Sequence, residues 1–115
     1  MTTAAIRVGV LGARGRVGRA VCTALSETSD LSVVAALGRG DALTQLVSSG
    51  AQVVVDFTHP DAVMGQLRFA IAHGIHAVVG TTGFSDERLT TLRQLLAAAP
   101  GVSVLIAPNF ALGAV

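Results

Sequence analysis

The sequence contains neither tryptophan nor tyrosine and only one cysteine, and just 13% of its 115 residues are charged. A single cysteine excludes an internal disulfide and a zinc site made of thiolates. The formal net charge of +1 provides no field for nucleic acid, and basic residues do not cluster with aromatics, so we expect no polyanionic partner. The longest apolar stretches are shorter than a membrane span, and the N-terminus lacks a signal-peptide pattern. We therefore expect a cytoplasmic protein without membrane contact.

About half of the sequence, 51%, is hydrophobic, and this half is dominated by aliphatic residues. Such a composition is typical of parallel strands that are covered on both faces. The length predicts one domain, residues 1–115, which can bury a single core but is small for a complete cofactor-using enzyme. Cys22 falls on the apolar side of a predicted helix, and we expect it to be a packed structural thiol.

Short apolar runs alternate with segments of helical periodicity, and each run ends near Gly, Pro, Asp or Asn. This alternation predicts βαβ units. The predicted strands are Ile6 to Leu11, Leu31 to Leu37, Val53 to Asp56, His76 to Gly80 and Val102 to Ala107. Five strands with four right-handed crossovers predict a Rossmann-like doubly wound parallel sheet in the order 3-2-1-4-5, with helices on both faces.

Apolar side chains at helical spacing predict which face of each helix packs inward. A short helix is expected around Ala42 to Val47. The other predicted inward-facing residues are Val17, Val21, Ala24 and Leu25 in the first helix, Val63, Leu67, Ala70 and Ile71 after Pro60, and Leu89, Leu92, Leu95 and Leu96 in the last.

Three glycines at three-residue spacing follow the first strand, in the stretch "GARGRVG". A strand, a glycine-rich turn and a helix form the context of a dinucleotide fingerprint, although GxxGxxG is looser than GxGxxG. Gly12 would permit the tight turn, Gly15 would let the main chain approach a pyrophosphate, and Gly18 would let the helix lie close to the sheet. Amides at the helix N-terminus would then meet the anionic group. The alternative is that the glycines only form a turn.

The end of the second strand usually distinguishes the two nicotinamide dinucleotides. A carboxylate there accepts hydrogen bonds from the adenosine ribose, whereas a small residue beside an arginine accommodates a 2′-phosphate. Gly38 and Arg39 occupy this point and favour NADP(H). Asp41 lies three residues further on and could still serve a ribose, so NAD(H) remains open. His59, on a neighbouring loop, would add positive charge at low pH.

Four stretches, "VGVLGARGRVG", "VVVDFTHPDAVM", "GIHAVVGTTGF" and "VLIAPNFALGAV", resemble in order and spacing the N-terminal half of the dihydrodipicolinate reductase family. The resemblance covers nearly the whole chain. It implies an NAD(P)H-dependent oxidoreductase of the diaminopimelate route to lysine, which transfers a hydride from NADPH or NADH to a cyclic dicarboxylate. It also implies that the full-length enzyme is a homo-oligomer.

The resemblance assigns cofactor contacts position by position along the chain. It implies that Gly12, Ala13, Arg14, Gly15, Arg16 and Val17 hold the pyrophosphate, and that Gly38 and Arg39 face the adenosine ribose. Phe57 and Thr58 would line the crevice, Gly80, Thr81 and Thr82 would lie beside the nicotinamide, and Thr82 would also approach the substrate. Ala107, Pro108, Asn109 and Phe110 would close the nicotinamide end.

This sequence departs from the family pattern at two points. Many relatives have an acid where this chain has Gly38, which puts a strong preference for NAD(H) in doubt. The family's substrate region, with its His-His, Lys and Ser-Gly-Thr signature, is absent from these 115 residues. We therefore expect no catalytic residue within this chain and no turnover by the chain alone.

Simpler structural roles remain open for several of these residues. Thr81 and Thr82 could form a polar turn, Asn109 could cap a helix, and Phe110 could belong to the core. His73 and His76 have no Cys or carboxylate at ligand spacing, so we expect no metal site, and without a nucleophile-elbow sequence a hydrolase is rejected.

Two other functions would use the same fold. One is a non-catalytic nucleotide-binding module, and the other is the cofactor domain of a different reductase, such as an aspartate-dehydrogenase-like or homoserine-dehydrogenase-like enzyme. The sequence that follows Val115 would distinguish all three.

Overall fold

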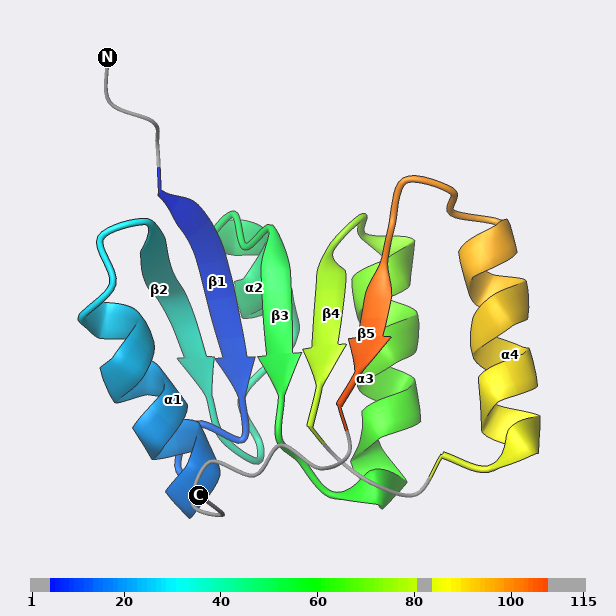
Figure 1. The fold of residues 1–115 in the computed structure, drawn as a ribbon, viewed down its shortest axis with the longest axis horizontal. Helices are drawn as coiled ribbons and strands as arrows, with labels where there is room; N and C mark the ends of the chain where they lie inside the picture. Colours follow the sequence, from blue (N-terminus) through cyan, green and yellow to red (C-terminus); the bar gives the residue numbers. More distant parts are fainter. Residues whose placement is uncertain (1–4, 81–83, 108–115) are drawn as a thin grey trace.

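A computed structural model describes residues 5–80 and 84–107, and its centre is a five-stranded parallel sheet with helices on both faces (Figure 1). The strands are β1 (Ile6–Leu11), β2 (Leu31–Leu37), β3 (Val53–Asp56), β4 (His76–Val79) and β5 (Val104–Ile106). The helices are α1 (Arg16–Ser26), α2 (Thr44–Ser48), α3 (Pro60–Ala72) and α4 (Asp86–Ala97). The predicted fold class is confirmed. In the same described ranges, no helix combines the length and apolarity that a membrane crossing requires.

The predicted order of the strands is wrong at one position. The sheet has the order β2-β1-β3-β4-β5, so β3 lies beside β1 and not at the outer edge of β2. This is the other common order of doubly wound sheets. The point where the order reverses therefore lies between β1 and β3.

The path of the chain after β2 explains this order. Leu46 of α2 is completely buried and lies so close to Gly9 of β1 that a β-carbon at Gly9 would overlap its Cδ2. The connection therefore crosses the face of β1 and delivers β3 to the far side. Gln52 fixes the start of β3 there, because its backbone amide donates to the Arg7 carbonyl at 2.8 Å and its Oε1 accepts from the Arg7 amide at 3.0 Å.

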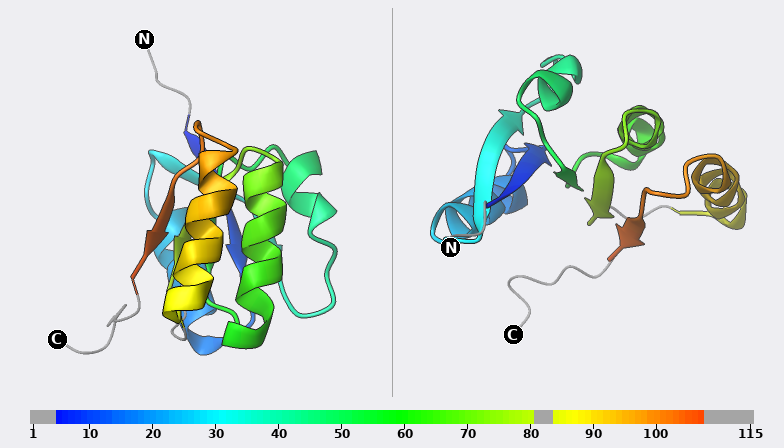
Figure 2. Two further views of the ribbon diagram at one scale, coloured as in Figure 1. Left: turned by 90° about the vertical axis from the view of Figure 1, so that its right-hand side faces the viewer. Right: turned by 90° about the horizontal axis from the view of Figure 1, so that it is seen from above.

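The helices divide unequally between the two faces of the sheet. Figure 2 shows α1 on one face, beside β1 and β2, and α2, α3 and α4 together on the other. The inward face of α3 is the predicted one, since its buried residues are Val63, Leu67, Ala70 and Ile71. On α4, Leu92 is buried, and Leu95 and Leu96 pack against the same core.

The inward face of α1 differs from the prediction by one position. Val17 is 37% exposed and Ala24 is exposed, whereas Gly18 is buried and Cys22 and Leu25 pack against the cluster that contains Val10. The hydrophobic spacing alone misplaces the inward face, whereas the glycine spacing already indicated that Gly18 lies close to the sheet. The helix thus meets the strand-to-helix turn through a residue without a side chain. Cys22 is half-buried, and burial raises the pKa of its thiol, as suits a structural cysteine.

Candidate functional site

A cleft of about 420 Å³ opens at the carboxyl ends of β1, β2 and β3. This is the edge of the sheet where doubly wound proteins bind ligands, and the volume falls in the range of small-molecule sites. Its lining residues come from three loops and from the first turns of α3. They are Leu11, Gly12, Arg14, Gly15, Leu37, Gly38, Arg39, Gly40, Asp41, Leu43, Phe57, Thr58, His59, Ala62 and Gln66.

The glycine-rich turn after β1 forms the floor of the cleft. Gly12 has a φ of +75°, which side chains disfavour, and a β-carbon there would lie 3.1 Å from the Phe57 carbonyl group. The amides of Gly12 and Ala13 both donate to the Leu37 carbonyl, at 3.0 and 3.1 Å. The turn is therefore held between the end of β2 and the loop after β3.

Helix α1 begins beside this cleft, because its N-cap residue Gly15 is one of the lining residues. Gly15 is the N-cap residue, and it offers no side-chain oxygen to the first-turn amides of Arg16, Val17 and Gly18. Those amides have no carbonyl partner within the helix, and the helix dipole adds partial positive charge at this end. An anionic group of a ligand could supply the missing hydrogen-bond acceptors.

The end of β2 brings three polar groups to one wall of the cleft. Gly38 and Arg39 line it, as the sequence predicts, and Arg39 is exposed. Arg14 reaches across from the glycine-rich turn, and Asp41 reaches back from the following loop. Arg14 and Asp41 form an ion pair, with 3.5 Å between the guanidinium NH2 and Oδ2. Arg14 and Arg39 are thus two cationic side chains beside a position that lacks a side chain.

The end of β3 forms the opposite wall around a buried carboxyl group. Asp56 is 1% exposed, and its Oδ1 accepts from the Thr58 amide at 2.9 Å. The Thr58 hydroxyl lies 2.5 Å from the same Oδ1 and 2.7 Å from Gln66 Oε1. Since that hydroxyl has one proton, it can donate to only one of them, and turning the Gln66 amide by 180° would make the second contact a bond donated by Nε2.

Burial raises the pKa of Asp56, and the two hydrogen bonds from Thr58 lower it by a smaller amount. Within the described part of the chain, Asp56 Oδ2 has no hydrogen-bond partner. The carboxyl group therefore organises the turn that leads into α3, and its ionised form is disfavoured there. Gln66, which lines the cleft, is tied to this turn through Thr58.

His59 begins α3 at the rim of the cleft. Its Nδ1 accepts from the Asp61 amide at 3.2 Å and lies 3.4 Å from an Asp61 carboxylate oxygen. One nitrogen cannot accept from the amide and donate to the carboxylate at once. We assign the amide bond, because the shorter contact belongs to the usual N-cap geometry. His59 thus serves first as a helix cap.

The structure brings together seven of the predicted cofactor-binding residues and leaves others away from the cleft. The seven are Gly12, Arg14, Gly15, Gly38, Arg39, Phe57 and Thr58. Ala13 is buried, Arg16 and Val17 are exposed on the first turn of α1, and Gly80 and Ala107 lie at the ends of β4 and β5 without lining the cleft. Thr81, Thr82, Pro108, Asn109 and Phe110 lie outside the described residues.

Gly80 is packed against a residue that does line the cleft. A β-carbon at Gly80 would lie 2.5 Å from the ring of Phe57. A residue with a side chain at position 80 would therefore displace that ring, which lines the cleft.

Sequence reasoning missed several residues of the cleft wall, among them Leu43, Ala62 and Gln66. Ala62 and Gln66 are four residues apart on α3 and directly precede the inward-facing Val63 and Leu67. The sequence signal for Gln66 was a polar residue next to an apolar helical stripe, and Ala62 carried no such signal. Among the described residues, no group of three His, Cys, Asp or Glu side chains could hold a metal ion.

The sequence of the chain is similar to known proteins. Residues 6–110 match the family model described as dihydrodipicolinate reductase, N-terminus. The chain is 62% identical over 110 residues to 4-hydroxy-tetrahydrodipicolinate reductase of Nocardia farcinica. The alignment covers 96% of this chain and 44% of that relative. It is 58% identical to the enzyme of the same name from Mycolicibacterium vanbaalenii, with 96% and 45% covered.

A solved structure shows the same fold. Dihydrodipicolinate reductase from Paenisporosarcina sp. TG-14, with dipicolinate bound, superposes with a TM-score of 0.80 at 26% identity. The match covers 93% of this chain and 48% of that one, so the chain spans about half the length of the relatives it matches. The family model covers nearly the whole chain, and the chain therefore belongs to the dihydrodipicolinate reductase family, whose N-terminal part it matches.

Proposed function

We propose that the chain binds NADPH or NADH in this cleft and is the cofactor-binding half of a 4-hydroxy-tetrahydrodipicolinate reductase. The family is one of NAD(P)H-dependent reductases, and the chain shares 62% identity with a relative named 4-hydroxy-tetrahydrodipicolinate reductase. When bound, the nicotinamide supplies a hydride for a cyclic dicarboxylate substrate, and this is the chemistry that the cofactor contributes. The residues of this chain bind and orient the dinucleotide.

One observation carries the proposal: the N-terminus of α1 has no side-chain cap, and it adjoins a cleft that is lined by Gly12 and by the N-cap residue Gly15. A dinucleotide pyrophosphate would accept hydrogen bonds from the first-turn amides of α1. Gly12 and Gly15 would let it approach the main chain. The walls at the ends of β2 and β3 would enclose the adenosine.

We further propose that NADPH binds more tightly than NADH. Arg14 and Arg39 both lie at the end of β2, and guanidinium groups bind phosphate through charge-assisted hydrogen bonds. The 115 residues would bind cofactor without turning over substrate, because they lack the family's His-His, Lys and Ser-Gly-Thr residues. We place the protein in the cytoplasm.

The pyrophosphate position is tested by replacing Val17 with glutamate. Val17 is 37% exposed on the first turn of α1. A carboxylate there is stabilised by the helix dipole but repels a pyrophosphate. We expect Val17→Glu to weaken NADPH and NADH alike, by about tenfold or more, in isothermal titration calorimetry. Val47→Glu is the control, since Val47 is 48% exposed on α2 and does not line the cleft. Unchanged affinity of Val17→Glu for both cofactors would place the pyrophosphate elsewhere.

A further inference from the structure

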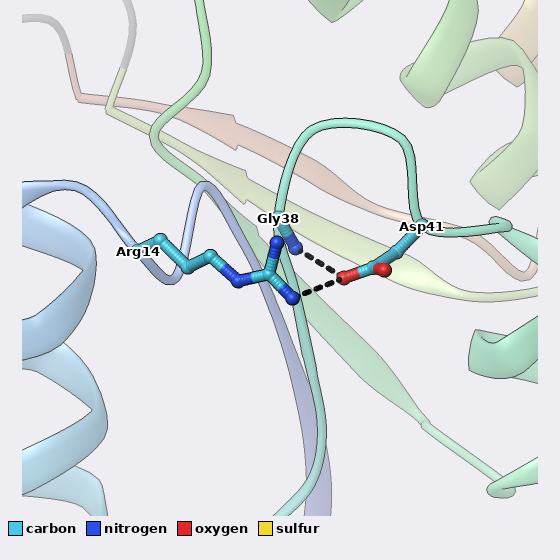
Figure 3. A network of polar contacts seen from close by, with 3 residues as sticks. All are labelled: Arg14, Gly38 and Asp41. Atoms are coloured by element: carbon cyan, nitrogen blue, oxygen red, sulfur yellow. Dashed lines mark hydrogen bonds and ion pairs between the residues drawn. The ribbon is translucent and has the colours of Figure 1, made fainter.

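Three residues at the end of β2 form a compact polar network, shown in Figure 3. Asp41 Oδ2 accepts a hydrogen bond from the Gly38 amide at 2.8 Å and lies 3.5 Å from the Arg14 guanidinium. The Asp41 side chain is 29% exposed, whereas that of Arg14 is 71% exposed. The carboxylate is thus the more fixed partner, and it accepts the hydrogen bond from the Gly38 amide, which directly follows β2.

A tight turn delivers the carboxylate to this place. The Asp41 amide donates to the Gly38 carbonyl at 3.2 Å, which closes a four-residue turn. Gly40 occupies its third position with a φ of +91°, a conformation that glycine adopts without strain. The turn therefore folds residue 41 back onto residue 38. A carboxylate stands at the end of β2 even though the residue at that end is glycine.

The missing side chain at position 38 makes room for Arg14. A β-carbon on Gly38 would lie 2.9 to 3.0 Å from Cδ, Nε and NH1 of Arg14, so any larger residue would displace the guanidinium. Arg14 can thus lie across the end of the strand, with Asp41 on one side of it. One cation and one anion share the place where the adenosine ribose of a dinucleotide binds.

The geometry points to Asp41 as the residue that sets the choice between NADH and NADPH, an inference that rests on the cofactor binding proposed above. With NADH, the carboxylate accepts hydrogen bonds from the ribose hydroxyls. With NADPH, the 2′-phosphate meets the same carboxylate as a like charge and competes with it for Arg14 and for the Gly38 amide.

The balance between these contacts decides whether Asp41 strengthens or weakens the preference for NADPH. An ion pair as exposed as that of Arg14 is weak, so a phosphate can draw the guanidinium away from Asp41 at little cost. The repulsion between the carboxylate and the phosphate remains after that exchange. Asp41 thus restrains the NADPH preference that Arg14 and Arg39 create. Removing its charge should widen this preference.

The test is a titration of this chain and its variants with NADPH and with NADH at one fixed ionic strength. Asp41→Asn retains an oxygen that can accept from the Gly38 amide, so it removes the charge and keeps the turn. Asp41→Ala removes both. Asp30→Asn is the matched control, because Asp30 is exposed and precedes β2 at the opposite end of the strand.

We expect Asp41→Asn to bind NADPH more tightly and NADH more weakly, with the ratio of the two dissociation constants changing at least tenfold. Asp30→Asn should leave that ratio unchanged. The inference is overturned if Asp41→Asn retains the wild-type ratio, or if Asp41→Ala weakens both cofactors equally while Asp41→Asn matches wild type, since Asp41 would then only support the turn. If wild type binds neither cofactor, the proposed function itself fails.

Discussion

Gly18 provides a direct test of how closely α1 must approach the glycine-rich turn. In Gly18→Ala, the new β-carbon would overlap the Gly12 carbonyl oxygen and lie 2.7 Å from the Gly12 carbonyl carbon and 2.9 Å from Ala13 Cα. Ordinary contacts begin near 3.4 Å, and all three of these neighbours are backbone atoms, so the helix or the turn must move by roughly 1 Å or more. Overpacking of this kind costs about 1–3 kcal/mol and occasionally more.

The helical preference of alanine opposes this cost but is smaller. Replacing a helical glycine by alanine stabilises a protein by about 1 kcal/mol at most when the added methyl group meets nothing. Gly65 of α3 provides that reference, because a β-carbon there has no neighbour within 4 Å. We therefore expect Gly18→Ala to lower the free energy of unfolding by about 1–2 kcal/mol, and Gly65→Ala to raise it by about 1 kcal/mol.

Urea unfolding followed by far-UV circular dichroism measures both variants, since the chain has no tryptophan or tyrosine to report by fluorescence. Calorimetry with NADPH adds a second readout. Gly18→Ala should lose affinity because its turn is displaced, while Gly65→Ala should bind as wild type does. The reasoning is refuted if both variants are stabilised to the same extent, because Gly18 would then be an ordinary helical position.

Three further predictions concern single side chains. Arg39→Ala should weaken NADPH by about 1–3 kcal/mol, the range for hydrogen bonds to charged groups, and leave NADH nearly unchanged in calorimetry; equal losses would contradict the assignment. Because burial raises the pKa of folded Asp56, its contribution to stability is present below the unfolded pKa and is lost as pH rises through the folded pKa. As the pH rises from the unfolded pKa to the folded one, wild type should therefore lose stability relative to Asp56→Asn in urea titrations, by about 1.4 kcal/mol per pH unit. Parallel curves of unfolding free energy against pH for the two proteins would exclude this. The Cys22 thiol, whose pKa burial also raises, should react with a disulfide reagent more slowly in the folded chain than in urea, and equal rates would show that it is not packed.

Local patterns in the sequence predicted the elements well and their arrangement less well. The bounds of β1, β2 and β3 agree with the prediction, because each strand is a short apolar run flanked by turn residues. The strand order depends on whether the second connection crosses β1. That choice is made by the contact between Leu46 and Gly9, and no periodicity along the chain records it.

The candidate site shows the same division between local and distant information. The strand, turn and helix around Gly12 were predictable, because the fingerprint is contained in one short stretch. The link from Asp56 through Thr58 to Gln66 was not, since it joins a strand end to the second turn of a helix. Residues that lie four apart on α3 enter the cleft only because the helix passes beside the end of β3.

The choice of cofactor shows most clearly what a single position can and cannot indicate. Gly38 alone indicates that no carboxylate meets the ribose, and with Arg39 it favours a 2′-phosphate. The turn that follows adds a carboxylate at the same place, because Gly40 lets Asp41 return to the Gly38 amide and pair with Arg14. An acid at position 38 would displace Arg14, because a β-carbon there would lie 2.9 to 3.0 Å from the Arg14 side chain. We therefore propose that the cofactor preference depends on the charge that reaches the end of β2, whichever residue of the turn provides it.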